Sequence, residues 1–158
     1  MEARINPYKA APGAYKAMAA LGAYGNSSGL EKPLMELVKL RASQINGCAY
    51  CIDMHTKDAL AAGETQQRLF LLDAWREAPF YSDRERAALE WTEALTKVYE
   101  GHVPDAIYLR VKTQFSDEEL ANLSIVIVTI NAWNRLGIAF RAEPGHYEPK
   151  AEGATTGA

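Results

Sequence analysis

Apolar residues recur along this chain at intervals of three and four positions, which is the spacing of amphipathic helices. The pattern is clearest after Leu30, where Leu34, Leu37, Val38 and Ile45 fall on one side of a helix. The sequence contains no pair of alternating segments bounded by hairpin turns, which would indicate strands. We therefore predict an all-α fold of about six to seven helices, at 15–24, 30–45, 48–62, 64–76, 83–100 and 120–140, with a short one after residue 104.

The segment 120–140 is apolar on nearly every side, so we expect it to form the central, buried helix. Ser116 and Glu119 form a capping box ahead of it. An unpaired polar group in such a helix costs about 1–3 kcal/mol, so we expect Asn131, Asn134 and Arg135 to have structural hydrogen-bond partners. The longest strongly apolar stretch, 123–130, is much shorter than the roughly 20 residues that span a bilayer, and we expect no transmembrane helix.

Length and composition favour one domain with irregular ends. A chain of 158 residues has the common size of a single domain. We assign residues 1–145 to one helical domain, in which 1–13, with Pro7 and Pro12, form an irregular lead-in. The tail 146–158 has too few apolar residues to offset the entropy of ordering it, so we expect it to be partly disordered.

Charge and cysteine content narrow the function classes. The net charge is −3 without a block of like charges, which argues against a nucleic-acid partner. The first 20 residues lack the basic start and apolar core of a secretory signal, and we expect a cytoplasmic protein without a membrane partner. The only two cysteines are three positions apart, so they are no framework for a secreted fold. In a reducing compartment such a pair is more often catalytic, redox-sensing or metal-binding.

Two sulfurs and one imidazole share a narrow face of the predicted helix 48–62. At 100° per residue, Cys48, Cys51 and His55 fall within about 60° of one another. Both cysteines lie in the first turn, where the helix dipole and unpaired N–H groups favour thiolate over thiol. His55 follows Cys51 by one turn, which places a possible general base nearer to this sulfur than to that of Cys48. Cys51 is therefore the candidate nucleophile.

Glu36 is the candidate fourth member of this group. The short connection at Asn46 and Gly47 predicts that the helices on either side are antiparallel, so a carboxylate at Glu36 could orient and charge His55. Other interpretations remain open at this point. His55 could be an interior structural histidine and Glu36 a solvated charge, or Cys48, Cys51 and His55, with or without Glu36, could hold zinc. The pair could also serve a non-enzymatic redox sensor or scaffold.

The stretch from Glu36 to His55 resembles the core motif of the alkylhydroperoxidase D and carboxymuconolactone decarboxylase superfamily. Residues 130–135 resemble the Asn-rich final helix of the same group, so the resemblance covers roughly residues 15–145. It implies an all-helical subunit that forms a homo-oligomer, a trimer or hexamer. It also implies a peroxidase without a bound cofactor, in which Cys51 attacks the hydroperoxide, Cys48 resolves, and His55 and Glu36 relay protons. The implied reductant is a dithiol protein, either lipoyl-bearing or thioredoxin-like.

One residue departs from the family pattern. Characterised peroxidases of the group can carry a second histidine between the cysteines, where this chain has Tyr50. A phenol titrates near pH 10 and does not replace imidazole as a base at neutral pH, so we interpret Tyr50 as a packing residue in the wall of the site. The decarboxylase branch lacks the paired cysteines, so their presence favours the redox branch.

Overall fold

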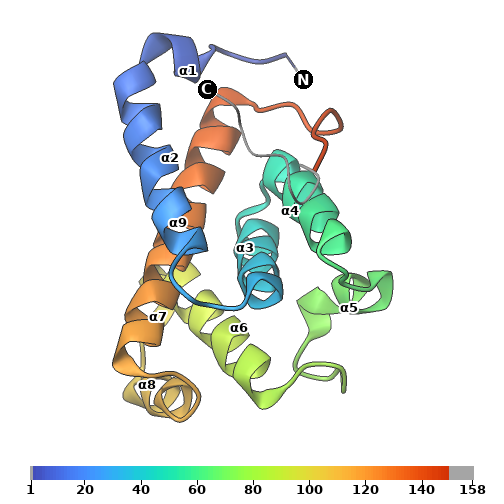
Figure 1. Ribbon diagram of the computed structural model, residues 1–158, viewed down its shortest axis with the longest axis vertical. Helices are drawn as coiled ribbons and strands as arrows, with labels where there is room; N and C mark the ends of the chain where they lie inside the picture. The colour runs from blue at the N-terminus through green and yellow to red at the C-terminus, as the bar shows by residue number, and fades with distance from the viewer. Residues whose placement is uncertain (1, 150–158) are drawn as a thin grey trace.

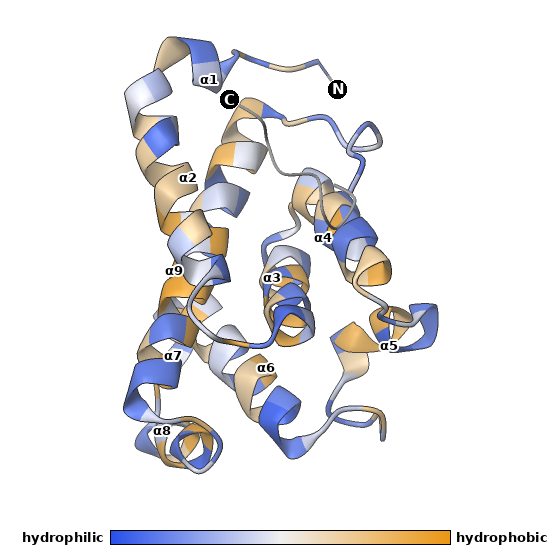
Figure 2. Ribbon diagram, in the orientation of Figure 1, coloured by the Kyte–Doolittle hydropathy of each residue, from blue (hydrophilic) through white to orange (hydrophobic). Residues whose placement is uncertain are grey.

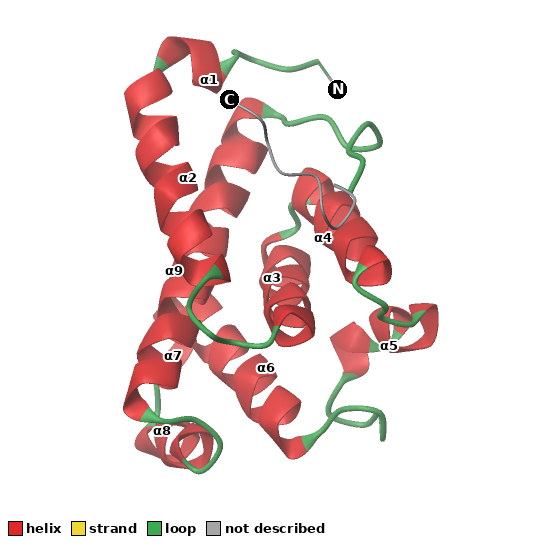
Figure 3. Cartoon of the chain, in the orientation of Figure 1, coloured by secondary structure: helices red, strands yellow, loops and turns green. Residues whose placement is uncertain are grey.

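The computed structural model describes residues 2–149, and all regular structure in them is helical (Figure 3). The predicted all-α fold is confirmed. The described residues form nine α-helices, six of them eight residues or longer, and one 3₁₀ turn. The elements are α1 (Pro7–Ala10), α2 (Pro12–Asn26), α3 (Lys32–Asn46), α4 (Ala49–Ala61), α5 (Gln66–Phe70), η1 (Leu72–Ala74), α6 (Asp83–Thr96), α7 (Val98–Gly101), α8 (Asp105–Lys112) and α9 (Asp117–Phe140).

The helix count differs from the predicted six to seven in three places. The lead-in contains the short helix α1, because the Asn6 side chain accepts a hydrogen bond from the Lys9 amide and Pro7 fits the first turn. The predicted helix 64–76 is divided into α5 and η1, and both contribute to one apolar cluster through Leu69 and Leu72. The predicted helix 83–100 is interrupted at Lys97. The apolar periodicity does not reveal such breaks.

Helix α3 is the centre of the bundle, with α4, α6 and α9 packed against it (Figure 1). One face, with Leu34 and Val38, packs against α6, α8 and α9. Another face, with Leu37 and Leu40, packs against the segment from α5 to α6. Full burial of one such side chain contributes about 1.5–3 kcal/mol, so α3 is a rigid support for the polar residues that it also carries.

Helix α9 is the longest element and is apolar along much of its length (Figure 2). Its capping box is present, and it packs against α2, α3 and α6. The prediction that it forms the central, buried helix is only partly right, because α3 occupies the centre of the bundle and, on α9, Val128 is 54% and Ile138 47% exposed. Within residues 2–149, α9 is the one helix whose length and composition would allow it to cross a membrane, a test that the core helix of a bundle also passes.

The chain after α9 turns back over α4. The Gly145 amide donates to Asp53 Oδ2 at 2.9 Å, the Lys57 ammonium donates to the Tyr147 carbonyl at 3.0 Å, and the Tyr147 hydroxyl donates to Asp58 Oδ1 at 2.7 Å. We call residues 143–149 the C-terminal strap. Of the tail 146–158 that we expected to be partly disordered, residues 150–158 lie outside the described residues.

Candidate active site

The turn between α3 and α4 positions the cysteine pair. Gly47 ends α3 with φ 70°, a left-handed conformation that favours glycine. The next amide, of Cys48, donates to the Ser43 carbonyl at 3.1 Å. Cys48 is the N-cap of α4 and Cys51 lies in its first turn, so the predicted position of both sulfurs at a helix N-terminus is confirmed.

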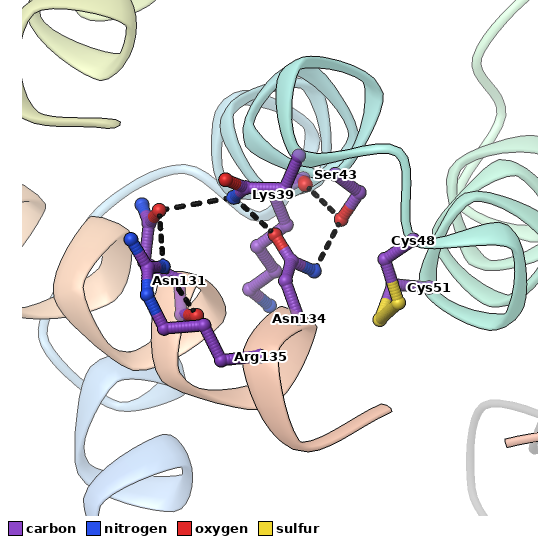
Figure 4. The surroundings of a disulfide bond; sticks show 8 residues. Lys39, Ser43, Cys48, Cys51, Asn131, Asn134 and Arg135 are labelled. Carbon is purple, nitrogen blue, oxygen red and sulfur yellow. Dashed lines mark hydrogen bonds between the residues drawn. A yellow bond between two sulfur atoms is a disulfide. The ribbon is translucent and has the colours of Figure 1, made fainter. Parts of the chain in front are cut away.

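Cys48 and Cys51 are joined by a disulfide, and both are buried (Figure 4). Gly137 of α9 lies directly against it, because a Cβ atom at this position would be 3.2 Å from the Cys48 sulfur and 3.6 Å from the Cys51 sulfur. A side chain at residue 137 would therefore press on the disulfide. Sequence reasoning missed this glycine, which gives no local signal within a helical segment.

Polar residues of α9 fix the turn that carries the disulfide (Figure 4). The Asn134 amide donates to Ser43 Oγ at 3.0 Å, and the Asn46 amide donates to Asn134 Oδ1 at 2.9 Å and to Asn131 Oδ1 at 3.0 Å. Arg135 donates to Asn131 Oδ1 at 3.0 Å. The expected structural pairing of these α9 residues is confirmed, and it links α9 to the end of α3.

Glu36 and His55 form a buried pair, as the antiparallel arrangement of their helices predicted. Their atoms Oε2 and Nδ1 are 2.8 Å apart, and Lys39 donates to the other carboxylate oxygen, Oε1, at 2.9 Å. Burial raises the pKa of the Glu36 carboxyl, but the hydrogen bond from His55 and the charge of Lys39 lower it more, and its pKa falls to about 2. Glu36 is thus an anion at neutral pH and accepts the proton on Nδ1 of His55.

The other ring nitrogen of His55 is the unpaired one. Nε2 is buried and has no hydrogen-bond partner among the described residues. Because Glu36 holds Nδ1, Nε2 is the nitrogen that can accept or release a proton. Buried polar atoms without partners are uncommon, and a catalytic role is one reason for them.

A cavity of about 760 Å³ lies between α2, α4 and α9 and reaches this pair. Cys51 and His55 line it, whereas Cys48 does not, so the two cysteines are not equivalent. Tyr50 is partly buried in the cavity wall, where we expected it. Burial raises the pKa of the Tyr50 phenol, so it stays protonated at neutral pH. The remaining lining is mainly apolar and includes Ile5, Leu21, Met54, Val126, Ile130, Trp133 and Leu136.

Asp58 and Tyr147 join the site although sequence reasoning did not select them. In residues 2–149, Glu36, His55 and Asp58 are the one group of acidic, histidine or cysteine side chains close enough to share a metal ion, with ligand atoms within 4.8 Å of one another. Neither cysteine belongs to this group. Asp58 follows His55 by three positions, a helical spacing that could have found it, whereas Tyr147 is 89 residues distant from Asp58.

The sequence profile of the carboxymuconolactone decarboxylase family matches residues 12–94, and the chain belongs to this family. It is 45% identical over 139 residues to the uncharacterized protein YdfG of Bacillus subtilis (strain 168), covering 88% of this chain and 95% of YdfG. The resemblance to this superfamily inferred from the motif is thus confirmed.

Solved structures share the fold. A protein of unknown function from Agrobacterium tumefaciens, described as a candidate antioxidant defence protein AhpD, is 44% identical with a TM-score of 0.89, over 92% of this chain and all (100%) of that chain. An uncharacterized peroxidase-related protein from Ralstonia eutropha JMP134 with the alkylhydroperoxidase AhpD core has a TM-score of 0.74 at 19% identity, over 89% of this chain and 75% of that one. The fold is therefore AhpD-like.

Proposed function

We propose that this protein is a thiol-dependent peroxidase with Cys51 as the nucleophile, Cys48 as the resolving cysteine, and His55 with Glu36 as the proton relay. The observation that carries this proposal is the shared cavity, which Cys51 and the Glu36-bound His55 both line and Cys48 does not. A sulfur and a proton-transfer group thus face the same space, where a small molecule can contact both.

In the first step, the Cys51 thiolate attacks the terminal oxygen of a hydroperoxide. The S–O bond forms and the O–O bond breaks, so Cys51 becomes a sulfenic acid and the peroxide leaves as an alkoxide. The alkoxide takes one proton from the protonated His55 ring and departs as the alcohol. The ionised Glu36 holds the ring in place through Nδ1, and the positive charge of the protonated ring stabilises the thiolate.

In the second step, the thiol of Cys48 attacks the Cys51 sulfenic acid, and one water molecule leaves as the disulfide forms. This disulfide is the state in which the two residues are found. A dithiol protein, lipoyl-bearing or thioredoxin-like, then returns both cysteines to thiols and is itself oxidised to a disulfide. No bound cofactor takes part in this cycle.

The cavity lining favours an organic hydroperoxide over hydrogen peroxide. Apolar side chains gain free energy by covering apolar parts of a substrate, and about 760 Å³ is within the usual size of a small-molecule site. The relatives named above for antioxidant defence and peroxidase-related function support the redox class. The proposal includes a cytoplasmic homo-oligomer, trimer or hexamer, to which the exposed apolar Val128 and Ile138 on α9 are suited.

Two alternatives use the same residues. A redox sensor would form the disulfide once and change a binding surface, without turnover. A zinc module would need the sulfurs of Cys48 and Cys51 as ligands, and these sulfurs are bonded to each other in the disulfide. The carboxylate of Glu36, another possible zinc ligand, is already paired with Lys39 and His55.

A steady-state assay separates these functions. The purified protein is supplied with hydrogen peroxide or several organic hydroperoxides, and with lipoyl-bearing or thioredoxin-like dithiol donors; Cys51→Ser is the control. If the protein is a peroxidase, we expect many turnovers, a higher rate with organic hydroperoxides than with hydrogen peroxide, and no turnover by Cys51→Ser. Consumption of one equivalent without turnover with any donor would favour the sensor. Stoichiometric zinc in the purified protein would favour the metal module.

A further inference from the structure

His55 lies between two cavities. In addition to the apolar cavity with Cys51, it lines a second cavity of about 810 Å³ together with Glu36, Asp58 and Tyr147. Cys51 is absent from the second lining, and Glu36 and Asp58 are absent from the first. The ring of His55 therefore connects the space where a hydroperoxide would react with a second, more polar space.

The second cavity leads from buried to solvent-exposed groups. Glu36 and His55 are each 6% exposed, whereas Asp58 and Tyr147 are partly exposed. The carboxylate of Asp58 offers an oxygen within 4.8 Å of the proton-binding atoms of both Glu36 and His55. One bridging water can span such a gap. Asp58 is thus the carboxylate between the buried pair and water.

The Tyr147 hydroxyl fixes Asp58 in this position. It donates to Asp58 Oδ1 at 2.7 Å, and the Lys57 and Asp53 side chains hold the strap that carries it. Burial raises the pKa of the Tyr147 phenol, and the hydrogen bond to Asp58 raises it further, so the hydroxyl keeps its proton and remains a donor.

The other charged groups in the second cavity are Lys32 and Lys39 of α3. Lys39 donates to Glu36 Oε1 at 2.9 Å and to Asn26 Oδ1 at 3.0 Å. Its ammonium therefore stabilises the Glu36 anion and is held by two acceptors. Among the described acidic groups around the pair, Asp58 alone combines proximity to His55 with partial exposure to solvent.

The proposed peroxidase step needs one proton from His55 for each alkoxide released, and the ring must be protonated again before the next cycle. The dithiol donor attacks the disulfide as a thiolate, whose proton has passed to water, so the ring recovers its proton from water. We propose that Asp58 is the solvent-side member of the proton path to the Glu36–His55 pair, and that Tyr147 of the C-terminal strap is its positioning residue. This inference rests on the proposed function. It assigns the strap to the reaction, although the strap is remote in sequence from both cysteines.

The test compares Asp58→Asn with Asp53→Asn, which lies on the same helix but does not line the second cavity. Asp53→Asn keeps a side-chain oxygen that can accept from the Gly145 amide, so the strap stays in place. At low buffer concentration, Asp58→Asn should lower kcat roughly tenfold, while KM for the hydroperoxide is unchanged. This is less than the roughly 100-fold or more expected for a general acid–base group itself, because Asp58 acts through the Glu36–His55 pair. Imidazole buffer should restore its rate in proportion to concentration. Tyr147→Phe should show a smaller loss of the same kind. Wild type and Asp53→Asn should be insensitive to buffer concentration.

A second readout does not require turnover. The exchange of the His55 ring proton with solvent, measured by NMR on the reduced protein, should be slower in Asp58→Asn than in wild type and Asp53→Asn. Equal exchange in all three proteins overturns the proton path, whether or not the wild type is a peroxidase. A second result would also overturn the proton path but leave the proposed function standing. In that result the wild type turns over, and the rate of Asp58→Asn is either equal to that of wild type or lowered without being restored by buffer.

Discussion

Helix α3 carries two buried charged residues, Arg41 and Glu36, and each pairs with a group of opposite type. The two pairs differ in whether the partner keeps a polar atom without a hydrogen bond. In the first, Arg41 donates to Glu93 Oε1 at 2.8 Å, and the same carboxylate accepts from Trp75 Nε1 at 2.9 Å and from Arg76 at 2.6 Å. In the second, Glu36 holds His55, whose Nε2 has no partner. A guanidinium does not release its proton in proteins, whereas an imidazole does at neutral pH. The first pair therefore stabilises the bundle, and the second is suited to chemistry.

The surroundings of the two pairs agree with this division. The Arg41–Glu93 pair connects α3 to α6 and to the segment around Trp75, beside an apolar cluster. The Glu36–His55 pair lies beside two cavities. Removing one partner should cost stability in either pair, whereas only the Glu36–His55 pair, which lies at the cavities, should also cost function. Substitutions in each pair separate these two outcomes.

The largest effect is expected at the cysteines. Both Cys51→Ser and Cys48→Ser should abolish the intramolecular disulfide. Cys51→Ser should also abolish the reaction with hydroperoxide, whereas Cys48→Ser should still form a sulfenic acid on Cys51, because Cys51 lines the cavity and Cys48 does not. Trapping with a dimedone-type reagent followed by mass spectrometry measures this difference. If Cys51→Ser forms a sulfenic acid on Cys48 while Cys48→Ser does not react, the assignment is reversed and Cys48 is the nucleophile.

His55→Ala should slow the first step by roughly 100-fold, the usual scale for loss of a general acid–base group. Part of the loss arises because the Cys51 thiol is less ionised without a cation beside it, so higher pH should partly restore the rate. Single-turnover oxidation at several pH values measures both parts. Arg41→Met is the matched control in the other pair, and its first step should be close to wild type. A rate of His55→Ala that does not rise with pH would contradict this account.

The two carboxylates should separate stability from activity. Glu93→Gln should cost about 1–3 kcal/mol of unfolding free energy and leave the peroxide step unchanged. Arg76 loses its anion, whereas Arg41 keeps the carboxylate of Asp73. Glu36→Gln should slow the peroxide step strongly. It should also cost up to about 3 kcal/mol of unfolding free energy, because the buried anion that pairs with His55 and Lys39 is lost. Denaturant unfolding and single-turnover oxidation of both variants measure the contrast. A Glu93→Gln enzyme that is stable but inactive would refute the division.

The acid dependence of stability gives a third comparison. The pKa of Glu36 is about 2 in the folded protein against 4.5 for a free side chain, so its contribution is fully present above about pH 4.5 and is lost as the pH falls towards 2. This window accounts for about 3 kcal/mol. Glu36→Gln should therefore lose less stability than wild type between pH 5 and pH 3. Equal losses in urea unfolding across this range would exclude a depressed pKa at Glu36.

The sequence predicted the arrangement of the part of the candidate site that lies within 20 residues. Glu36, Cys48, Cys51 and His55 occupy two helices joined by a tight turn at Gly47, so helical spacing and one turn residue determine their arrangement. The all-α class was predictable for the same reason, because apolar periodicity is a local property. The pairing of Glu36 with His55 followed from the antiparallel connection alone.

The remaining parts depend on contacts between distant segments. Tyr147 reaches Asp58 across 89 residues, and Gly137 approaches the Cys48 sulfur from α9, so neither position has a local signal. The interruption at Lys97 and the division of 64–76 depend on how the segments pack, which propensity does not determine. Sequence reasoning thus found the candidate residues that the turn at Gly47 brings together and missed the residues that surround them.

The smallest effect concerns two helical glycines with different surroundings. Replacing glycine by alanine inside a helix stabilises it by about 1 kcal/mol. At Gly22 of α2 the new Cβ would be 4.0 Å from Thr129 Cγ2, an ordinary contact, so Gly22→Ala should gain most of this amount. At Gly137 the new Cβ would be 3.2 Å from the Cys48 sulfur. Overpacking of this kind costs about 1–3 kcal/mol, so it should cancel or exceed the helical gain.

The cost at Gly137 should depend on the redox state, because a disulfide is anchored to the backbone at both ends and cannot rotate away from the new methyl group. Two free thiols can adopt other rotamers. Gly137→Ala should therefore lower the unfolding free energy of the oxidised protein by up to about 2 kcal/mol and that of the reduced protein by less. Denaturant unfolding with and without a reductant measures this difference, with Gly22→Ala as the control. If Gly137→Ala stabilises the oxidised protein as much as Gly22→Ala does, then α9 is not packed tightly against the disulfide.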